Sequence, residues 1–207
     1  MALYSVKISN ELLIGLWEID ESSSELLSLI QLTPNQQSSF INIQNEKRKK
    51  EWIAVRLLLQ VMLNRTDCEI IYSNSGKPSL FTKEYSISHS GKFATLLLCK
   101  NNKAGIDIQL MKSEIQKGKD FYLSKKELKQ IDAINNNDII YAYWGAKETL
   151  FKYCSYSEID FKNELKIDSF NWNKSGEITG KITQKNVIEL VKLKYEKLDN
   201  YMLIYTL

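Results

Sequence analysis

Apolar and polar residues follow one another along the start of the chain in patterns typical of strands and then of helices. Apolar residues dominate Leu3 to Ile8 and Leu12 to Ile19, between turn-like breaks, which predicts two strands. A polar stretch from Asp20 to Ser24 then leads into a short helix. From Asn45 to Asn64 the apolar residues recur at helical spacing, and Asn45 suits an N-cap, so we expect a long amphipathic helix there.

Strands and turns alternate in the middle of the chain. Residues 74–78 read Asn-Ser-Gly-Lys-Pro, which is a turn by composition. The segment Asn101-Asn102-Lys103 is expected to turn a hairpin. Three strands are predicted around it, at Tyr85 to Ser88, Phe93 to Lys100 and Ala104 to Leu110.

Helical patterns return in the second half and then give way to strands. Ser124 begins the capping-box pattern Ser-Lys-Lys-Glu, which predicts the start of a helix. A second, long helix is expected from about Asp138 to Cys154. From Leu165 onward the pattern indicates antiparallel strands, with Asp199-Asn200 turning the last hairpin.

The two halves of the chain repeat the same order of elements. Each runs from a strand through a long helix bearing a tryptophan to a closing hairpin, with Trp52 and Trp144 in the two helices. We therefore predict an α+β protein of two pseudo-duplicated lobes, residues 1–102 and 103–207. An ordinary α+β meander without duplication is the alternative reading.

Composition narrows the classes of function. The 207 residues are 43% hydrophobic, enough for a sizeable core, and 28 basic against 25 acidic residues leave a net charge of only +3. This balance argues against nucleic acid as the main partner. The three separated cysteines are expected to be reduced, no secretory signal is seen, and runs such as Phe93 to Cys99 are too short to cross a membrane. We expect a cytoplasmic protein.

Two segments of the first half carry candidate anion-binding groups. The single histidine, His89, lies between Ser88 and Ser90, in what reads as a small polar loop after a strand. One histidine without an elbow motif does not support a Ser-His-Asp triad. The basic run from Lys47 to Lys50, followed by Arg56, opens the first long helix, where the helix dipole disfavours cations. The run indicates a held anion, although such runs are often only solvated faces.

Two segments of the second half carry candidate carboxylates. Asp107 lies between apolar residues of a predicted strand, and Gly105 allows another backbone or a ligand to come close. On the predicted long helix, Trp144, Glu148 and Lys152 share one face at i, i+4 and i+8. A plain surface Glu–Lys pair is the alternative interpretation of that spacing.

Taken in order, these segments resemble the surfactin-type 4′-phosphopantetheinyl transferases. That family shows a basic helix start, then Gly-Lys-Pro, a Ser-His pair after a strand, Gly-(Ile/Val)-Asp-x-(Glu/Asp) and Trp-x-x-Lys-Glu-x-x-x-Lys. The matching segments cover about half of the chain: Lys47 to Lys50, Gly76-Lys77-Pro78, Ile87-Ser88-His89-Ser90, Gly105 to Gln109, and Trp144 to Lys152.

The resemblance implies a magnesium-dependent enzyme that transfers the phosphopantetheine arm of coenzyme A to a serine of an acyl or peptidyl carrier protein. Adenosine 3′,5′-bisphosphate would leave, and either Glu148 or a water held by the metal would take the serine proton. The implied fold has two similar lobes, each a small antiparallel sheet on a long helix, with coenzyme A in the cleft between them. A duplicated chain of this kind predicts a monomer.

The resemblance also implies roles for individual residues. Lys47, Lys50 and Arg56 would hold the adenosine phosphates, and Lys77, Ser88 and His89 would contact the nucleotide and its 3′-phosphate. Asp107 and Glu148 would bind Mg²⁺, with Gln109 in the metal shell, and Lys152 would bind coenzyme A and stabilise charge on the phosphate.

One position departs from the family pattern. Gln109 stands where the family usually has a third carboxylate, and an amide oxygen brings no negative charge, so weaker Mg²⁺ binding is expected. This favours one alternative, a weak or silent relative that binds coenzyme A or a carrier protein without transfer. A second alternative, a nucleic-acid module built on the Lys47 cluster, predicts steep salt dependence of binding.

Overall fold

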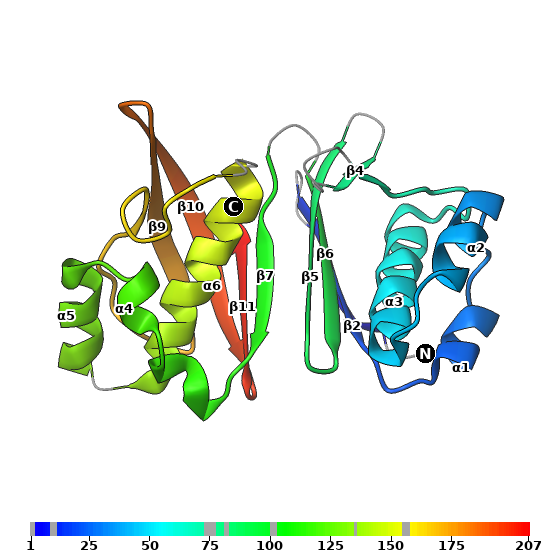
Figure 1. The fold of residues 1–207 in the computed structure, drawn as a ribbon, viewed down its shortest axis with the longest axis horizontal. Helices are drawn as coiled ribbons and strands as arrows, with labels where there is room; N and C mark the ends of the chain where they lie inside the picture. The colour runs from blue at the N-terminus through cyan, green and yellow to red at the C-terminus, as the bar shows by residue number, and fades with distance from the viewer. Residues whose placement is uncertain are drawn as a thin grey trace. The chain divides into compact units, whose positions relative to one another are not determined.

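The chain forms two compact units in the computed structural model, which describes residues 3–8, 12–72, 78–80, 83–99, 103–134, 136–154 and 158–207. Unit 1 is Met1–Asn102 and unit 2 is Lys103–Leu207. Both are mixtures of helices and antiparallel strands (Figure 1), so the α+β fold class is confirmed. The predicted turn before Pro78, including Lys77, lies outside the described residues, as do Asn101 and Asn102.

The described residues of unit 1 form a six-stranded sheet and three helices. The sheet order is β1-β2-β6-β5-β4-β3, with every pair antiparallel. Its elements are β1 (Leu3–Ile8), β2 (Leu12–Glu18), α1 (Ser23–Ser28), α2 (Pro34–Ile41), α3 (Glu46–Leu63), β3 (Ile71–Tyr72), β4 (Pro78–Leu80), β5 (Lys83–Ser90) and β6 (Phe93–Cys99).

The long helix α3 covers one face of this sheet and packs on β2 and β6, with α1 and α2 beyond it (Figure 1). Asn45 caps α3 as predicted, because its side chain accepts a hydrogen bond from the backbone N–H of Arg48. The helix ends at Asn64, which adopts the left-handed conformation common at helix C-termini. Apolar side chains such as Trp17, Ile53 and Leu58 form the buried core of the unit.

Unit 2 combines a five-stranded antiparallel sheet, in the order β7-β11-β10-β9-β8, with four helical segments. Its elements are β7 (Ile106–Leu110), the 3-10 helix η1 (Ser113–Gln116), α4 (Lys119–Tyr122), α5 (Lys125–Ile134), α6 (Asn137–Cys154), β8 (Leu165–Ile167), β9 (Ser175–Gln184), β10 (Val187–Leu198) and β11 (Tyr201–Thr206).

The long helix α6 lies across this sheet and packs on β7 and β11 (Figure 1). The predicted capping box is present at the start of α5, where Ser124 and Glu127 exchange hydrogen bonds through backbone and side chain. Tyr143 and Leu150 from α6 pack with sheet residues such as Tyr195 in the core of the unit. No helix within the described ranges is long and apolar enough to span a membrane.

The two units share a topology, as the sequence predicted. In each, the strand that precedes the helices lies beside the last strand of the unit, and that last strand pairs with its hairpin partner. This gives the order β2-β6-β5 in unit 1 and β7-β11-β10 in unit 2. Each unit also places its long helix on the first two of these strands.

Two local predictions are wrong. The strands predicted on either side of Asn101-Asn102-Lys103 do not pair with each other, because both edges of β6 are taken by β2 and β5, whereas β7 pairs with β11 in the other sheet. Ser88 to Ser90 do not form a loop either. They continue β5, whose Ser90 pairs with Phe93 across a two-residue turn at Gly91 and Lys92. Gly91 has a φ of 58°, which a turn this tight requires.

Candidate active site

Asp107 and Lys152 form the centre of the candidate site in unit 2. The Lys152 ammonium lies 2.7 Å from Asp107 Oδ1 and donates a further hydrogen bond, at 3.0 Å, to the carbonyl of Ile106. Asp107 is only 1% exposed, whereas the Lys152 side chain is partly exposed. The pair therefore joins β7 to α6, and Lys152 connects the buried carboxylate to solvent.

Glycine allows the strand and the helix to approach this closely. A Cβ on Gly105 would lie 2.3 Å from the carbonyl oxygen of Thr149, and a Cβ on Gly145 would lie 2.8 Å from Cδ1 of Ile204 on β11. The prediction that Gly105 permits close approach is confirmed, and the approaching group is the backbone of α6.

Glu148 lies on the same helix, one turn before Lys152. Burial, followed by the charge of Asp107, raises the pKa of Glu148 from 4.5 to about 7, while Lys152 acts in the opposite direction. The two carboxylates are thus near enough to repel each other. A plain surface pair does not describe these residues, because Lys152 bonds to Asp107 and Glu148 is only partly exposed.

Gln109 completes a set of oxygen-bearing side chains. Its amide nitrogen donates to Asp107 Oδ2 at 3.0 Å, so the carboxylate is held from both sides and the amide oxygen of Gln109 stays available as an acceptor. Two carboxylates and an amide fit Mg²⁺, which takes few protein ligands and completes its shell with waters and substrate phosphates. No cluster of three His, Cys, Asp or Glu side chains suited to a metal occurs in the part of the chain that the structure describes.

Lys147, the neighbour of Glu148, has a role that the sequence did not reveal. Its side chain is fully buried and forms an ion pair of 3.0 Å with Glu127, itself buried. Burial lowers the pKa of Lys147, while Glu127 opposes that shift. The ammonium also donates to three backbone carbonyls, those of Tyr122, Phe161 and Leu165. These bonds fix α6 to three neighbouring segments, and so fix the helix that carries Glu148 and Lys152.

In unit 1, the start of α3 meets the end of β5 at a charged cluster. His89 Nδ1 lies 3.2 Å from Glu51, and His89 Nε2 lies 2.5 Å from the guanidinium of Arg48. Lys47 also faces Glu51, at 3.7 Å. The sequence placed Lys47 and His89 among the anion-binding groups but did not single out Arg48 or Glu51. Their spacing from Lys47 on one helix was the available signal.

Three other residues with predicted phosphate roles lie in different settings. Lys50, in the first turns of α3, lies near two acidic side chains, Glu25 of α1 and Glu46 of α3. Ser88 is buried within β5. Arg56 is also buried, and its guanidinium is engaged within α3, because it stacks on the ring of Trp52 and bonds to that residue's carbonyl. We therefore leave Arg56 out of the site.

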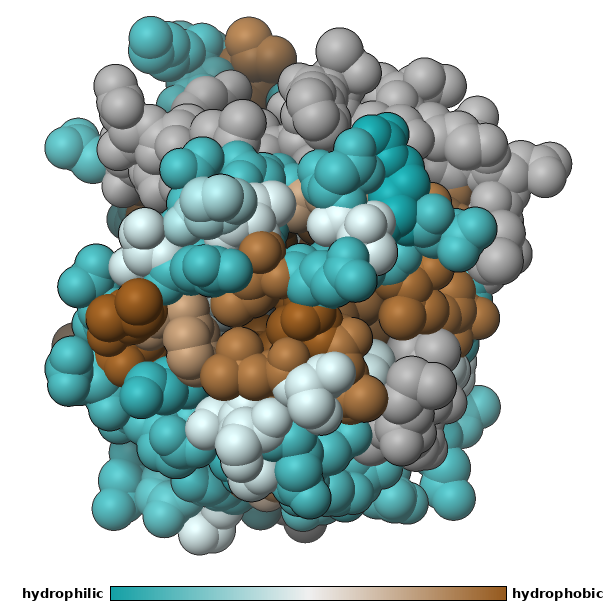
Figure 2. Space-filling view, turned by 90° about the vertical axis from the view of Figure 1, so that its right-hand side faces the viewer, coloured by the Kyte–Doolittle hydropathy of each residue, from teal (hydrophilic) through white to brown (hydrophobic). Residues whose placement is uncertain are grey.

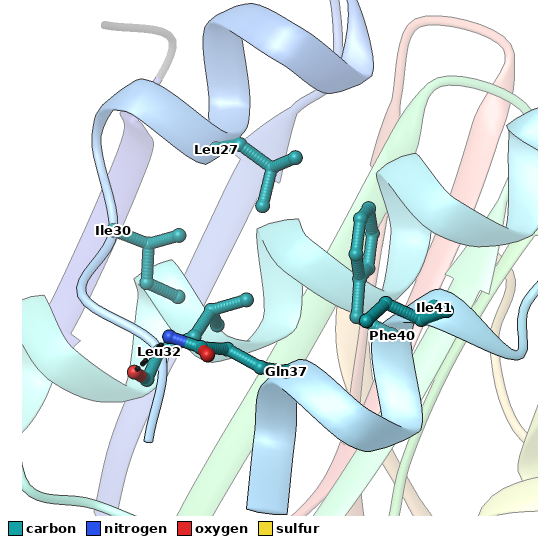
Figure 3. Close-up of a pocket in the computed structure, with 6 residues that line it drawn as sticks. All are labelled: Leu27, Ile30, Leu32, Gln37, Phe40 and Ile41. Atoms are coloured by element: carbon teal, nitrogen blue, oxygen red, sulfur yellow. Dashed lines mark hydrogen bonds between the residues drawn. The ribbon is translucent and has the colours of Figure 1, made fainter. Parts of the chain in front are cut away.

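An apolar pocket of about 330 Å³ lies elsewhere in unit 1, between α1 and α2. Figure 2 shows a band of apolar side chains on the face that carries it. In Figure 3 the Gln37 amide bonds to the carbonyl of Leu32 at one end, and apolar side chains form the rest of the lining, namely Leu27, Ile30, Leu32, Phe40 and Ile41. None of the predicted site residues lines this pocket.

Comparison with known proteins agrees with the motifs at the level of the superfamily. The family model of the 4′-phosphopantetheinyl transferase superfamily matches residues 103–203. The chain is 26% identical over 125 residues to a Synechocystis sp. protein named provisionally as a 4′-phosphopantetheinyl transferase, covering 53% of this chain and 51% of that protein. It is 30% identical over 114 residues to the 4′-phosphopantetheinyl transferase AcpT of Escherichia coli K12, covering 51% of this chain and 57% of AcpT.

The chain thus spans about half the length of the curated relatives that it matches. The matched family region, residues 103–203, includes all four residues of the unit 2 cluster, Asp107, Gln109, Glu148 and Lys152. Together with the two-sheet α+β fold, this match shows that residues 103–203 belong to the 4′-phosphopantetheinyl transferase superfamily.

Proposed function

We propose that this protein transfers the 4′-phosphopantetheine group of coenzyme A to a serine hydroxyl of an acyl or peptidyl carrier protein. The observation that carries the proposal is the unit 2 cluster. In it, Glu148 lies near the Asp107–Lys152 ion pair, and its pKa is raised to about 7. A carboxylate with a pKa near neutral suits a general base at physiological pH. An adjacent, partly exposed lysine suits a phosphate.

The chemistry assigned to these residues is a substitution at phosphorus. Glu148 accepts the proton of the carrier serine, whose oxygen forms a bond to the β-phosphorus of coenzyme A. The bond from that phosphorus to the bridging oxygen breaks, and adenosine 3′,5′-bisphosphate leaves with its electron pair. Lys152 stabilises the negative charge that develops on the phosphate oxygens.

Asp107, Glu148 and the Gln109 amide oxygen are the groups that would hold Mg²⁺. When bound, Mg²⁺ neutralises pyrophosphate charge and orients the phosphates for in-line attack. Repulsion between Asp107 and Glu148 contributes to the raised pKa of Glu148, and a cation beside both carboxylates would relieve it. In unit 1, Lys47, Lys50, Ser88 and His89 are proposed to bind the phosphates of the nucleotide, together with Lys77.

The test is the intact mass of an apo carrier protein after incubation with coenzyme A and Mg²⁺. We expect a gain of one phosphopantetheinyl group with the wild-type protein, and loss of that gain in Glu148→Gln. The matched control is Glu177→Gln, which neutralises an exposed carboxylate on β9 and should keep full activity. Equal activity of both variants would refute the role of Glu148.

Gln109 favours a second candidate, a relative that binds coenzyme A without transfer, because the amide supplies no charge to a metal. Calorimetric binding of coenzyme A, with no mass gain on any apo carrier protein, would support this candidate and overturn the transferase proposal.

A further inference from the structure

The charged cluster at the start of α3 leaves one face open to solvent. The Arg48 side chain is 51% exposed and the His89 side chain 33%, whereas Glu51 behind them is only 7% exposed. An anion from solvent can therefore reach the arginine and the imidazole, but the carboxylate lies beneath them. Within the cluster, Glu51 touches His89 at 3.2 Å and Arg48 at 3.6 Å.

The hydrogen-bond partners assign the proton of His89. A guanidinium can only donate, so His89 Nε2, 2.5 Å from Arg48, accepts. Nδ1 then carries the proton and donates it toward Glu51. The imidazole in this structure is neutral, with its orientation set by a carboxylate on one side and a guanidinium on the other.

An approaching phosphate changes this balance. A phosphate dianion is a better partner for the Arg48 guanidinium than a neutral ring nitrogen is. Once Arg48 turns to the phosphate, the unprotonated Nε2 of His89 presents its lone pair to the phosphate oxygens. The lone pair and the anion repel each other. Proton uptake from solvent at Nε2 removes that repulsion, and the Glu51 carboxylate stabilises the resulting imidazolium through Nδ1.

We propose that Glu51 is a positioning residue that couples protonation of His89 to binding of a phosphate monoester between His89 and Arg48. In this binding reaction, neutral His89 takes up one proton from solvent, and the resulting imidazolium pairs with the phosphate dianion. This inference rests on the proposed function for the identity of the ligand, the 3′-phosphate of coenzyme A. Its geometry depends only on unit 1.

The charged groups around His89 agree with this role. From α3 the ring faces Arg48 and Glu51, and Lys47 reaches Glu51 from one helical turn earlier in α3. From β6 its register partner is Ala94, which carries no charge. Among the described residues of these elements, Glu51 is thus the carboxylate in contact with the ring, and Glu51 also contacts the cations Lys47 and Arg48.

A purely electrostatic or structural role for Glu51 predicts a different outcome. Neutralising a carboxylate beside an anion site should tighten phosphate binding, since a repulsive charge is removed. The positioning role predicts weaker binding above neutral pH, because the imidazolium loses its support. The sign of the effect of Glu51→Gln therefore separates the two. Glu46→Gln is the matched control, because Glu46 lies on the same helix near Lys49 and Lys50 but does not touch His89.

The experiment uses the single histidine of the chain, which gives one imidazole signal pair in ¹⁵N NMR. The 207-residue chain is titrated from pH 5 to 9 with coenzyme A, with 3′-dephospho-coenzyme A and without ligand. We expect coenzyme A to raise the midpoint of His89 titration by about one unit, and 3′-dephospho-coenzyme A to leave it near the ligand-free value. In Glu51→Gln, affinity for coenzyme A should fall about tenfold at pH 7.5 and less than about threefold at pH 5, with Glu46→Gln unchanged or tighter.

Tighter binding in Glu51→Gln at pH 7.5, or a His89 midpoint that coenzyme A does not move, would overturn the inference. The mass test of transfer is read separately. Transfer without movement of the His89 midpoint refutes the inference and leaves the proposed function standing. Proton-linked binding without transfer refutes the function and supports the inference.

Discussion

Replacement of Glu148 by glutamine should make the metal-free protein more stable and inactive. The side chain is only partly exposed, and its pKa is raised from 4.5 to about 7, first by burial and then by Asp107. Ionisation of Glu148 is thus harder in the folded state than in the unfolded state, and a difference of one unit corresponds to about 1.4 kcal/mol. The neutral, isosteric amide removes that penalty and also removes the base.

The pH window follows from the sign of the shift. Below the unfolded value of 4.5 the carboxyl is protonated in both states, so wild type and Glu148→Gln should be equally stable. As pH rises from 4.5 to 7, the unfolded chain loses the proton while the folded protein retains it, and wild-type stability falls. Glu148→Gln should therefore exceed wild type by under about 1 kcal/mol at pH 5 and by about 3 kcal/mol at pH 8.5.

Urea unfolding in EDTA at these two pH values measures the difference, with Glu177→Gln as the exposed-carboxylate control. In a thermal scan at pH 8.5, the gain should appear as a rise in melting temperature of about 6 to 12 °C. A Glu148→Gln protein that is less stable than wild type at pH 8.5, or a difference that does not change between pH 5 and 8.5, would show that ionisation of Glu148 carries no such penalty in the folded state.

The remaining predictions concern the packing around the same cluster. Gln109→Glu should lower the Mg²⁺ concentration needed for half-maximal transfer, because it adds a charged ligand, and an unchanged requirement would remove this position from the metal shell. Gly105→Ala should lower both the melting temperature and the transfer rate, since its methyl group would lie 2.3 Å from the Thr149 carbonyl oxygen; wild-type values would contradict the tight contact of β7 with α6. Asp107→Asn should reduce transfer at least about a hundredfold, checked by initial rates, with near-normal turnover excluding a role for this carboxylate. Lys147→Met should lower stability by about 3 kcal/mol or more in urea unfolding, because the buried Glu127 loses its cation, and a neutral effect would show that the pair is dispensable.

Much of the fold was predictable, because local signals agreed with tertiary packing. The cap at Asn45, the capping box at Ser124 and the turn at Asp199 each mark an element boundary that the structure confirms. The false hairpin after β6 has a different origin. Turn-like residues can equally join two compact units, and only the pairing of β6 with β2 and β5 excludes β7.

The site was predictable in residue type but not in detail. Motif spacing selected Asp107, Glu148 and Lys152, and the structure brings Lys152 into contact with Asp107. The burial of Lys147 against Glu127 could not be inferred, because Glu127 lies on the preceding helix, α5, and only the packing of α5 on α6 brings the two side chains together. The Arg48–His89–Glu51 cluster likewise joins residues about 40 positions apart in the chain. They meet only because the fold places the end of β5 against the start of α3.

The central claim is that Asp107 and Glu148 share one divalent cation with the pyrophosphate of coenzyme A. Crystals grown with coenzyme A and Mn²⁺ in place of Mg²⁺ test it directly through anomalous scattering. We predict an anomalous peak about 2.1 to 2.3 Å from one carboxylate oxygen of Asp107, from one carboxylate oxygen of Glu148 and from pyrophosphate oxygens. A peak bonded to the pyrophosphate but to neither carboxylate would contradict it.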